Sequence, residues 1–203
     1  MHKRAFDLVG SLVAFIILSP IFLITAMLIK LDCPGPVLYM AERIGKNGKL
    51  FEMYKFRTMV ADAARLGSAI TCNEDPRITR VGRFLRRTHI DEWPQFFNIL
   101  RGDMSFVGPR PEAPTYIEHY TPQQREVLNG RPGMTGLAQV QYMQNEAAML
   151  DATTLDEVYL NEILPKKLEL DLQYIQNQSF LLDLQLLIQT LFITLIERSG
   201  GDS

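Results

Sequence analysis

The first part of the chain is dominated by a long run of uncharged, mostly apolar residues. Leu8 to Ile29 contains 22 residues and no charged side chain. At about 1.5 Å per residue, such a helix is roughly 33 Å long, enough for a hydrocarbon core of about 30 Å. No small-x-small cleavage pattern follows the run, which argues against a cleaved signal peptide. We therefore expect residues 1–32 to form a membrane helix.

This helix is expected to break at Ser19-Pro20. Pro20 lacks the N–H group that a helix would use, and its ring clashes with the carbonyl group four residues earlier. The Ser19 hydroxyl could satisfy a backbone group that Pro20 frees, as a break inside lipid requires. The sequence therefore predicts a kinked helix.

Basic residues flank the segment on both sides, and such residues favour the cytoplasmic side of a membrane. They are Lys3, Arg4, Lys30, Arg43, Lys46 and Lys49. A straight span would send one basic flank across the membrane, whereas a re-entrant helix-break-helix keeps both flanks on the cytoplasmic side. A single-pass anchor with a tolerated proline remains the alternative.

A β-hairpin is expected after the membrane segment. Val37–Met40 and Leu50–Phe56 have the composition of strands, and the residues Gly45-Lys46-Asn47-Gly48 between them suit a tight turn. The rest of the chain reads as helical segments, so the sequence predicts an α+β fold that is mostly helical.

Capping signals and periodicity place several of these helices. They are expected over Met59–Leu66, Val81–Arg87, Asp91–Leu100 with Asp91 as the N-cap, and after Thr121, where a capping box occurs. The last segment, Leu181–Ile196, is amphipathic and not a clear second span. It fits either an ordinary core helix or a helix lying in the membrane interface.

Composition and charge narrow the function classes. The 203 residues are 47% hydrophobic and 22% charged, which describes one folded domain, and a formal charge of −2 gives no argument for nucleic-acid binding. Residues 55–110, however, carry ten basic and six acidic side chains, so this part of the chain can meet an anion. Cys33 and Cys72 have no metal-ligand spacing, which argues against zinc and against a disulfide scaffold.

The densest chemistry lies between Asp75 and Gln95, where five arginines precede the adjacent carboxylates Asp91 and Glu92. The arginines form either a solvated basic face or a diphosphate clamp, and Arg86 and Arg87 are the members closest to the carboxylates. A carboxylate there could attack phosphorus or hold Mg²⁺ against phosphate oxygens. The plainer alternative makes Asp91 an N-cap and Glu92 a first-turn residue.

Four motifs carry a family resemblance. They are Lys55-Phe56-Arg57-Thr58-Met59, Asp91-Glu92-Trp93-Pro94-Gln95, the run Gly102 to Pro111 that contains Pro109-Arg110-Pro111, and Arg131 to Val140. In order and spacing they resemble the bacterial sugar transferases called monotopic polyprenyl-phosphate phosphoglycosyl transferases. The Ser19-Pro20 segment resembles the re-entrant membrane helix of that family. The chain looks like its minimal catalytic unit, with a membrane helix at 1–32 and a cytoplasmic catalytic domain at 33–203.

The resemblance implies a reaction at the cytoplasmic face of the bacterial inner membrane. A UDP-sugar would donate its sugar-1-phosphate to polyprenyl (undecaprenyl) phosphate, releasing UMP and starting a surface glycan on its lipid carrier. The family mechanism passes through a covalent aspartyl-phosphosugar. Direct transfer in a ternary complex, and a non-catalytic membrane scaffold, are the two alternatives. The partners are then the donor, the acceptor and membrane lipid, with no nucleic acid.

The same resemblance assigns roles to individual residues. Asp91 would be the nucleophile, Glu92 the ligand of Mg²⁺, and Arg110 a contact of the transferred phosphate. Candidate phosphate or nucleotide contacts are Lys55, Arg57 and Arg131, and a late acidic position of the family corresponds to Asp171. The diphosphate-clamp reading of the arginine run adds Arg86 and Arg87 as candidate substrate contacts. His89 is expected to be structural. The sequence leaves open the sugar, the polyprenyl length, a homodimer, and whether Pro109 or Pro111 follows a cis peptide bond.

Overall fold

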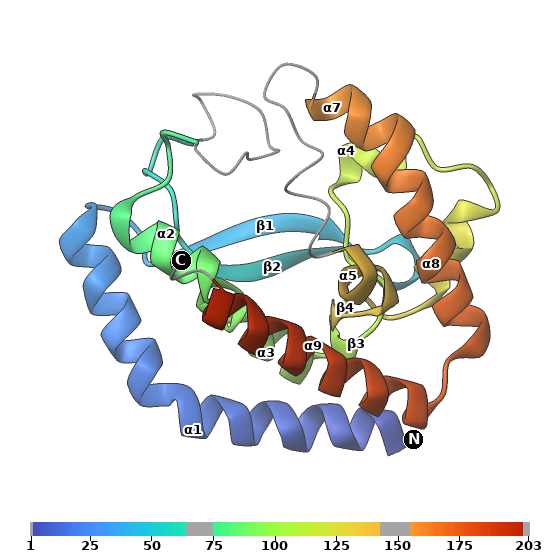
Figure 1. Ribbon diagram of the computed structural model, residues 1–203, viewed down its shortest axis with the longest axis horizontal. Coiled ribbons are helices and arrows are strands. Elements are labelled where there is room, and N and C mark those ends of the chain that lie inside the picture. The colour runs from blue at the N-terminus through green and yellow to red at the C-terminus, as the bar shows by residue number, and fades with distance from the viewer. Residues whose placement is uncertain (1, 64–74, 143–154, 201–203) are drawn as a thin grey trace.

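The computed structural model describes residues 2–63, 75–142 and 155–200 (Figure 1). One long helix, α1 (His2–Asp32), runs along two sides of the remaining chain, which combines a β-hairpin, a small parallel strand pair and helices. The predicted α+β fold is confirmed. Among the described residues, α1 is the one helix long and apolar enough to cross a membrane by length and composition.

Helix α1 consists of two arms joined by a sharp bend (Figure 1), and Pro20 lies inside it. The carbonyl oxygen of Ile16 is the acceptor that an N–H at position 20 would have used. The Ser19 hydroxyl donates to this oxygen at 2.8 Å. The side chain of Ser19 thus compensates for the missing donor, as the sequence predicts.

One side of α1 packs on the domain and the other is bare. Ala14, Leu18 and Phe22 pack against a core cluster that includes Ile99 and Met104. The outer side exposes large apolar side chains along both arms. These include Val9, Leu12, Ile16, Ile17, Leu23, Ile24, Met27 and Leu31. Such an uncovered apolar surface is far more than a soluble monomer usually presents.

Both ends of α1 are bonded to the same domain. At the start, the Arg4 guanidinium donates to the carbonyl oxygens of Ile99 at 2.6 Å and Leu100 at 3.0 Å. At the end, an Asp32 carboxylate oxygen accepts the backbone N–H of Val81 at 3.0 Å. The sequence pattern identifies Arg4 only as a charge that flanks the membrane segment, whereas in the structure Arg4 holds the helix on the domain.

The predicted hairpin is confirmed. Strands β1 (Leu38–Ile44) and β2 (Leu50–Phe56) pair antiparallel in a register that joins Leu38 to Phe56 and Ile44 to Leu50. A 3₁₀ turn, η1 (Lys46–Gly48), connects them, with positive φ at Asn47 (58°) and Gly48 (74°). Asn and Gly tolerate this left-handed conformation, which is why the Asn-Gly pair marks the turn. Strand β1 runs four residues beyond the predicted end.

The helix expected over Met59–Leu66 is wrong for the residues described there. Met59 forms a bridge with Ile78, and flanking backbone bonds join Thr79 N to Thr58 O at 3.0 Å and Val60 N to Arg77 O at 2.9 Å. Residues 64–66 lie outside the described part. Helix propensity is a weak local preference, and here pairing with a distant segment outweighs it.

Helix α2 (Arg80–Arg87) begins one residue before the predicted start, and the Thr79 hydroxyl caps it by accepting the Gly82 N–H. The helix predicted over Asp91–Leu100 is shorter, because α3 (Gln95–Arg101) begins after Pro94. A separate 3₁₀ turn, η3 (Ile90–Glu92), contains Asp91. Asp91 is therefore not the N-cap of that helix, contrary to the prediction.

Strands β3 (Ser105–Val107) and β4 (Gly133–Thr135) form a parallel pair that the sequence pattern does not predict. Glycines allow the two backbone segments to approach closely at the ends of these strands. A Cβ on Gly133 would lie 2.1 Å from the Gly108 nitrogen, and one on Gly136 would lie 2.2 Å from the Gly108 oxygen. Only residues without a side chain fit there.

The helices after β3 complete the domain. They are α4 (Pro114–Ile117), the 3₁₀ segment η4 (Gln124–Asn129), α5 (Leu137–Tyr142), α7 (Leu155–Val158), the π-helical turn η5 (Tyr159–Ile163), α8 (Leu164–Asn177) and α9 (Phe180–Gly200). The predicted capping box precedes η4: Thr121 N donates to Gln124 Oε1 at 2.8 Å, and Gln124 N to Thr121 Oγ1 at 3.2 Å. The cap is confirmed, although the segment that follows is 3₁₀.

Helix α9 begins beside the N-terminal end of α1 (Figure 1), where the Phe6 and Phe180 rings meet edge to face. Asp183 and Leu186 on its inner side are buried. Its outer side exposes Leu181, Leu191 and Phe192 among other apolar residues. The helix therefore has one side in the core and an uncovered side that is largely apolar.

Candidate active site

The two adjacent carboxylates lie in the tight turn between α2 and α3. His89 precedes the turn with φ of 54°, a left-handed conformation that ends α2 and redirects the chain. Asp91 follows and is buried, with 9% of its surface exposed. The irregular turn brings Glu92 to the hairpin and to the loop after β3, which supply its basic partners.

Glu92 is held by two basic side chains from distant segments. Its Oε1 lies 2.7 Å from Lys55 Nζ on β2 and 3.2 Å from a guanidinium nitrogen of Arg110. Burial alone would raise the pKa of Glu92, but Lys55 and Arg110 outweigh it and hold that pKa well below its usual range. Glu92 is therefore ionised at neutral pH.

Asp91 has the opposite electrostatic balance. Burial raises the pKa of Asp91 to about 6, and the charge of Glu92 beside it adds to the rise. Lys55, Arg86 and His89 oppose the rise. The two neighbouring carboxylates thus have different pKa values. Such a difference allows a protein to use two similar groups for two different roles.

The two arginines of α2 predicted as substrate contacts differ in position. Arg86 donates from Nε to the Thr58 hydroxyl at 2.9 Å. Burial lowers the pKa of Arg86, and the nearby Asp91 carboxylate counteracts part of that effect. Arg87 is exposed on the same helix. Arg86 therefore belongs to the charged surroundings of Asp91, and Arg87 lies at the surface.

Arg57 lies elsewhere. Its guanidinium donates to the carbonyl oxygens of Cys33 at 2.5 Å and Pro34 at 3.0 Å, in the loop that leaves α1. The residue is buried, and Gly35 (φ 126°) passes so close that a Cβ there would lie 2.1 Å from the guanidinium. The structure thus uses Arg57 to fasten the exit of α1, and does not place it with Glu92 as it does Lys55.

Asp171 is hydrogen-bonded to the backbone of the loop that carries Arg110. It is buried on α8 and accepts a hydrogen bond from the backbone N–H of Arg110. Burial raises the pKa of Asp171 to about 8, Lys167 opposes the rise, and Glu112 adds to it. Among the described residues its Oδ1 has no hydrogen-bond partner. Asp171 thus stabilises the Arg110 loop and is not itself part of the Asp91–Glu92 pair.

Arg131 lies at the base of the same loop. Its carbonyl oxygen is packed against Gly108, where a Cβ would lie 2.3 Å from it. Its buried Nε has no hydrogen-bond partner in the part of the chain that the structure describes. The structure thus brings Arg131 next to the Arg110 loop.

The structure adds a polar group that the sequence reasoning missed. Glu112 accepts the Tyr159 hydroxyl at 2.7 Å, and its backbone oxygen accepts the Ile44 N–H at 3.0 Å. Burial lowers the pKa of Arg43, while Glu112 counteracts this and Arg110 adds to it. The position of Glu112 directly after Pro109-Arg110-Pro111 was the available signal.

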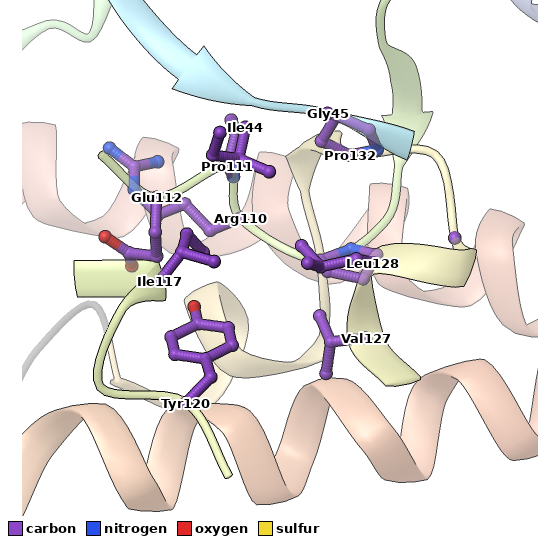
Figure 2. Close-up of a pocket in the computed structure, with 12 residues that line it drawn as sticks. Ile44, Gly45, Arg110, Pro111, Glu112, Ile117, Tyr120, Val127, Leu128 and Pro132 are labelled. Carbon is purple, nitrogen blue, oxygen red and sulfur yellow. The ribbon is translucent and has the colours of Figure 1, made fainter. Parts of the chain in front are cut away.

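A small pocket lies beside this polar group (Figure 2). Figure 2 shows the charged ends of Arg110 and Glu112 on one side and the apolar side chains of Val127 and Leu128 on the other. The lining is completed by Ile44, Gly45, Pro109, Pro111, Ile117, Tyr120, Gly130 and Pro132. Arg110 therefore borders both the pocket and the carboxylate pair.

The donor set is compatible with magnesium. Among the described residues no group of three or more His, Cys, Asp or Glu side chains could hold a metal ion. Mg²⁺, however, usually takes one or two carboxylates and completes its shell with water and substrate phosphates. Asp91 and Glu92 supply such a pair. The peptide bonds before Pro109 and Pro111 are trans, as are all peptide bonds in the described segments.

Known proteins are similar to this chain over nearly its whole length. A family model described as bacterial sugar transferase matches residues 1–197. The chain is 39% identical over 194 residues to a UDP-N-acetylgalactosamine-undecaprenyl-phosphate N-acetylgalactosaminephosphotransferase of Aeromonas hydrophila, covering 93% of this chain and 42% of that protein. It is 38% identical over 211 residues to an undecaprenyl-phosphate glucose phosphotransferase of Komagataeibacter xylinus, covering 98% and 37%.

The chain thus spans about two fifths of the length of these two relatives. A third relative, the exopolysaccharide production protein PSS of Rhizobium leguminosarum bv. phaseoli, is 40% identical over 205 residues, covering 98% of this chain and 97% of that protein. The family model and these relatives each match more than nine tenths of the chain. The resemblance found in the motifs is confirmed, and the chain belongs to the bacterial sugar transferase family.

Proposed function

We propose that this protein transfers a sugar-1-phosphate from a UDP-sugar to polyprenyl phosphate, releasing UMP, as the first membrane step of a surface glycan. The observation that carries this proposal is the pair Asp91 and Glu92, with Lys55 and Arg110 bound to Glu92, in a domain attached to an exposed apolar helix. The names of two relatives, which act on undecaprenyl phosphate with N-acetylgalactosamine or glucose, support the same chemistry.

Asp91 is the nucleophile in this proposal. One carboxylate oxygen attacks the sugar-bearing phosphorus, the bond from that phosphorus to the bridging oxygen breaks, and UMP leaves with the bond's electron pair. The resulting aspartyl-phosphosugar is attacked by a phosphate oxygen of the polyprenyl phosphate. This second displacement frees Asp91 and yields the polyprenyl-diphosphate-sugar.

The different basicity of the two carboxylates supports this division of roles. Glu92 is bound at Oε1 by Lys55 and Arg110, so its electrons are poorly available for attack. The pKa of Asp91, raised to about 6 by burial, leaves it mostly ionised at neutral pH yet more nucleophilic than an ordinary carboxylate. Arg110 and Arg86 would offset the negative charge of the diphosphate as Asp91 approaches.

Magnesium is the proposed cofactor, and Glu92 is its proposed ligand. A bound Mg²⁺ would neutralise diphosphate charge and aid the departure of UMP. Lys55 and Arg110 would also fix the position of the Glu92 carboxylate before the ion binds. Ligand groups whose positions are set in advance lose less entropy on binding.

The proposed topology of α1 is re-entrant, from the cytoplasmic face of the inner membrane and back. A single-pass anchor would carry the N-terminal end to the far side, yet Arg4 is bonded to the end of α3 and Asp32 to the start of α2. A cysteine introduced at His2 tests this. We expect an impermeant thiol reagent to label it only from the cytoplasmic side, and labelling from the other side would establish a span.

The test of the function is UMP release by the full chain reconstituted in lipid, with Mg²⁺, polyprenyl phosphate and a panel of UDP-sugars. We expect UMP from one donor and loss of the activity in Asp91→Asn. Release of UDP would mean that the other bond of the donor breaks. No turnover with any donor in the panel would favour a non-catalytic scaffold.

A further inference from the structure

Charged residues at the start of the apolar helix reach into the domain beside the active site. Asp7 is 1% exposed, and its Oδ1 accepts the Ser105 hydroxyl and the Phe106 backbone N–H, both at 3.1 Å. Ser105 and Phe106 belong to β3. A carboxylate buried on an otherwise apolar helix is costly unless hydrogen bonds compensate. Here the compensation comes from β3, so the contact fixes the strand relative to α1.

Lys3 holds the other end of the same strand. Its ammonium lies 2.9 Å from the carbonyl oxygen of Val107, 2.6 Å from a carboxylate oxygen of Asp183 and 3.1 Å from the Tyr174 hydroxyl. Tyr174 in turn bonds Asp183 at 2.6 Å. Three helices, α1, α8 and α9, thus converge on the last residue of β3. We call Lys3, Asp7 and Asp183, with the strand they hold, the β3 clamp.

Strand β3 leads directly to Arg110. Gly108 donates to the Thr135 carbonyl oxygen at 2.9 Å, and Gly133 donates to the Pro109 carbonyl oxygen at 2.8 Å. The rings of Pro109 and Pro111 also restrict the backbone on both sides of Arg110. A shift of β3 is therefore passed on to Arg110, whose guanidinium lies 3.2 Å from Glu92.

We propose that Asp7 and the Lys3–Asp183 pair are positioning residues, which set the place of Arg110 against Glu92 through β3 and so couple the seating of the membrane helix to turnover. This inference rests on the proposed function, in which Arg110 meets the phosphate. It assigns a second role to α1. Besides anchoring the domain, the first arm of α1 holds β3 in place and thereby positions the loop that carries Arg110.

A purely structural clamp would also lower stability, so the test must separate stability from positioning. A double-mutant cycle does so, because residues that act through one another show non-additive effects whereas independent residues add. The variants are Asp7→Ala, Arg110→Ala and their combination, with Asp7→Asn as the conservative change and Glu169→Gln, at an exposed position of α8, as the control. Each is assayed for kcat, KM and unfolding temperature in lipid.

We expect Asp7→Ala to lower kcat by about tenfold to a hundredfold, since small misplacements of a catalytic group have effects of this size. KM should change by less than about threefold. Asn can still accept both hydrogen bonds with Oδ1, so Asp7→Asn should recover most of the activity. In the Arg110→Ala background, Asp7→Ala should have almost no further effect on kcat. Effects that multiply, or a conservative variant as impaired as Asp7→Ala, would overturn the proposal.

Amide hydrogen exchange provides a readout that does not require activity. In Asp7→Ala the 105–111 segment should exchange faster than in the wild type, while Glu169→Gln leaves it unchanged. Faster exchange without a loss of turnover, or unchanged exchange, would overturn the coupling. A wild type without UMP release would instead refute the proposed function, and the exchange data would still decide whether Asp7 holds β3.

Discussion

Lys55 Nζ lies 2.7 Å from Glu92 Oε1, so strand β2 fixes one carboxylate of the pair while its neighbour Asp91 stays buried with a raised pKa. Lys55 thereby distinguishes two chemically similar side chains. It lowers the pKa of Glu92 directly, and it opposes the rise in that of Asp91 more weakly than burial promotes it.

Replacing Lys55 should impair both carboxylates. In Lys55→Met, Glu92 loses one of its two basic partners, and leaving a buried charge short of a partner is costly. We expect kcat/KM for UMP release to fall about a hundredfold, a typical loss for one electrostatic partner at an active site. Lys49→Met, at an exposed position before β2, is the matched control and should keep full activity. Equal activity of both variants would contradict the role of Lys55.

The raised pKa of Asp91 predicts that this buried carboxylate, the proposed nucleophile, destabilises the fold. Burial moves this pKa from 3.8 to about 6, so the protonated form is favoured in the folded state, and stability falls as pH rises through about 6. Asp91→Asn removes that effect. Without Mg²⁺ at pH 7.5 it should be more stable than the wild type by on the order of 2 kcal/mol.

Below about pH 3 the difference should vanish, because Asp91 is then protonated in both the folded and the unfolded state. Unfolding temperatures measured across this pH range test the prediction. A variant that is less stable than the wild type at pH 7.5 would show that Asp91 is a stabilising residue, as an N-cap would be.

Asp171 should act as a neutral acid at pH 7. Its pKa is raised to about 8 by burial, so folding favours the protonated form and stability is lost as pH rises through about 8. Asp171→Asn keeps an acceptor for the Arg110 N–H. We expect this variant to match the wild type at pH 7 within about threefold in turnover, and to lose less stability than the wild type between pH 7 and 9. Parallel pH profiles would contradict a neutral Asp171.

Replacing Arg57 should mainly lower stability, whereas replacing Arg86 should mainly lower the rate of turnover. Arg57 bonds the carbonyl oxygens of Cys33 and Pro34, so Arg57→Met should lower the unfolding temperature and change KM for the donor by less than about threefold. Arg86 lies within the charged surroundings of Asp91, so Arg86→Met should lower kcat by about tenfold or more. Steady-state kinetics with thermal unfolding distinguishes them, and a large KM increase in Arg57→Met would place that residue at the donor.

Features encoded by neighbouring residues were predictable from the sequence. The apolar run predicts α1, Asn47-Gly48 predicts the hairpin turn, and the Ser19 hydroxyl finds the carbonyl group that Pro20 leaves without its donor. In each case a short stretch carries the whole signal. The family motifs single out Lys55, Glu92 and Arg110 as site residues, whereas the ion pairs that join Lys55 and Arg110 to Glu92 are known from the structure alone.

Features that depend on distant partners were not predictable. The segment around Met59 has helix-forming residues, yet its backbone pairs with residues near Ile78. Strands β3 and β4 are each three residues long, too short for any alternation to be recognised. Arg57 shares a motif with Lys55 but extends to the loop after α1, a direction that only the fold determines.

The covalent step can be tested by intact-protein and peptide mass spectrometry of the reconstituted chain, incubated with Mg²⁺ and its UDP-sugar in the absence of polyprenyl phosphate. We expect the peptide containing Asp91 to gain the mass of one sugar phosphate and UMP to be released in equal amount. Adding polyprenyl phosphate should then remove the adduct. Asp91→Asn should form none. Turnover that requires both substrates together, with no adduct and no UMP before the acceptor is added, would contradict the account and establish direct transfer.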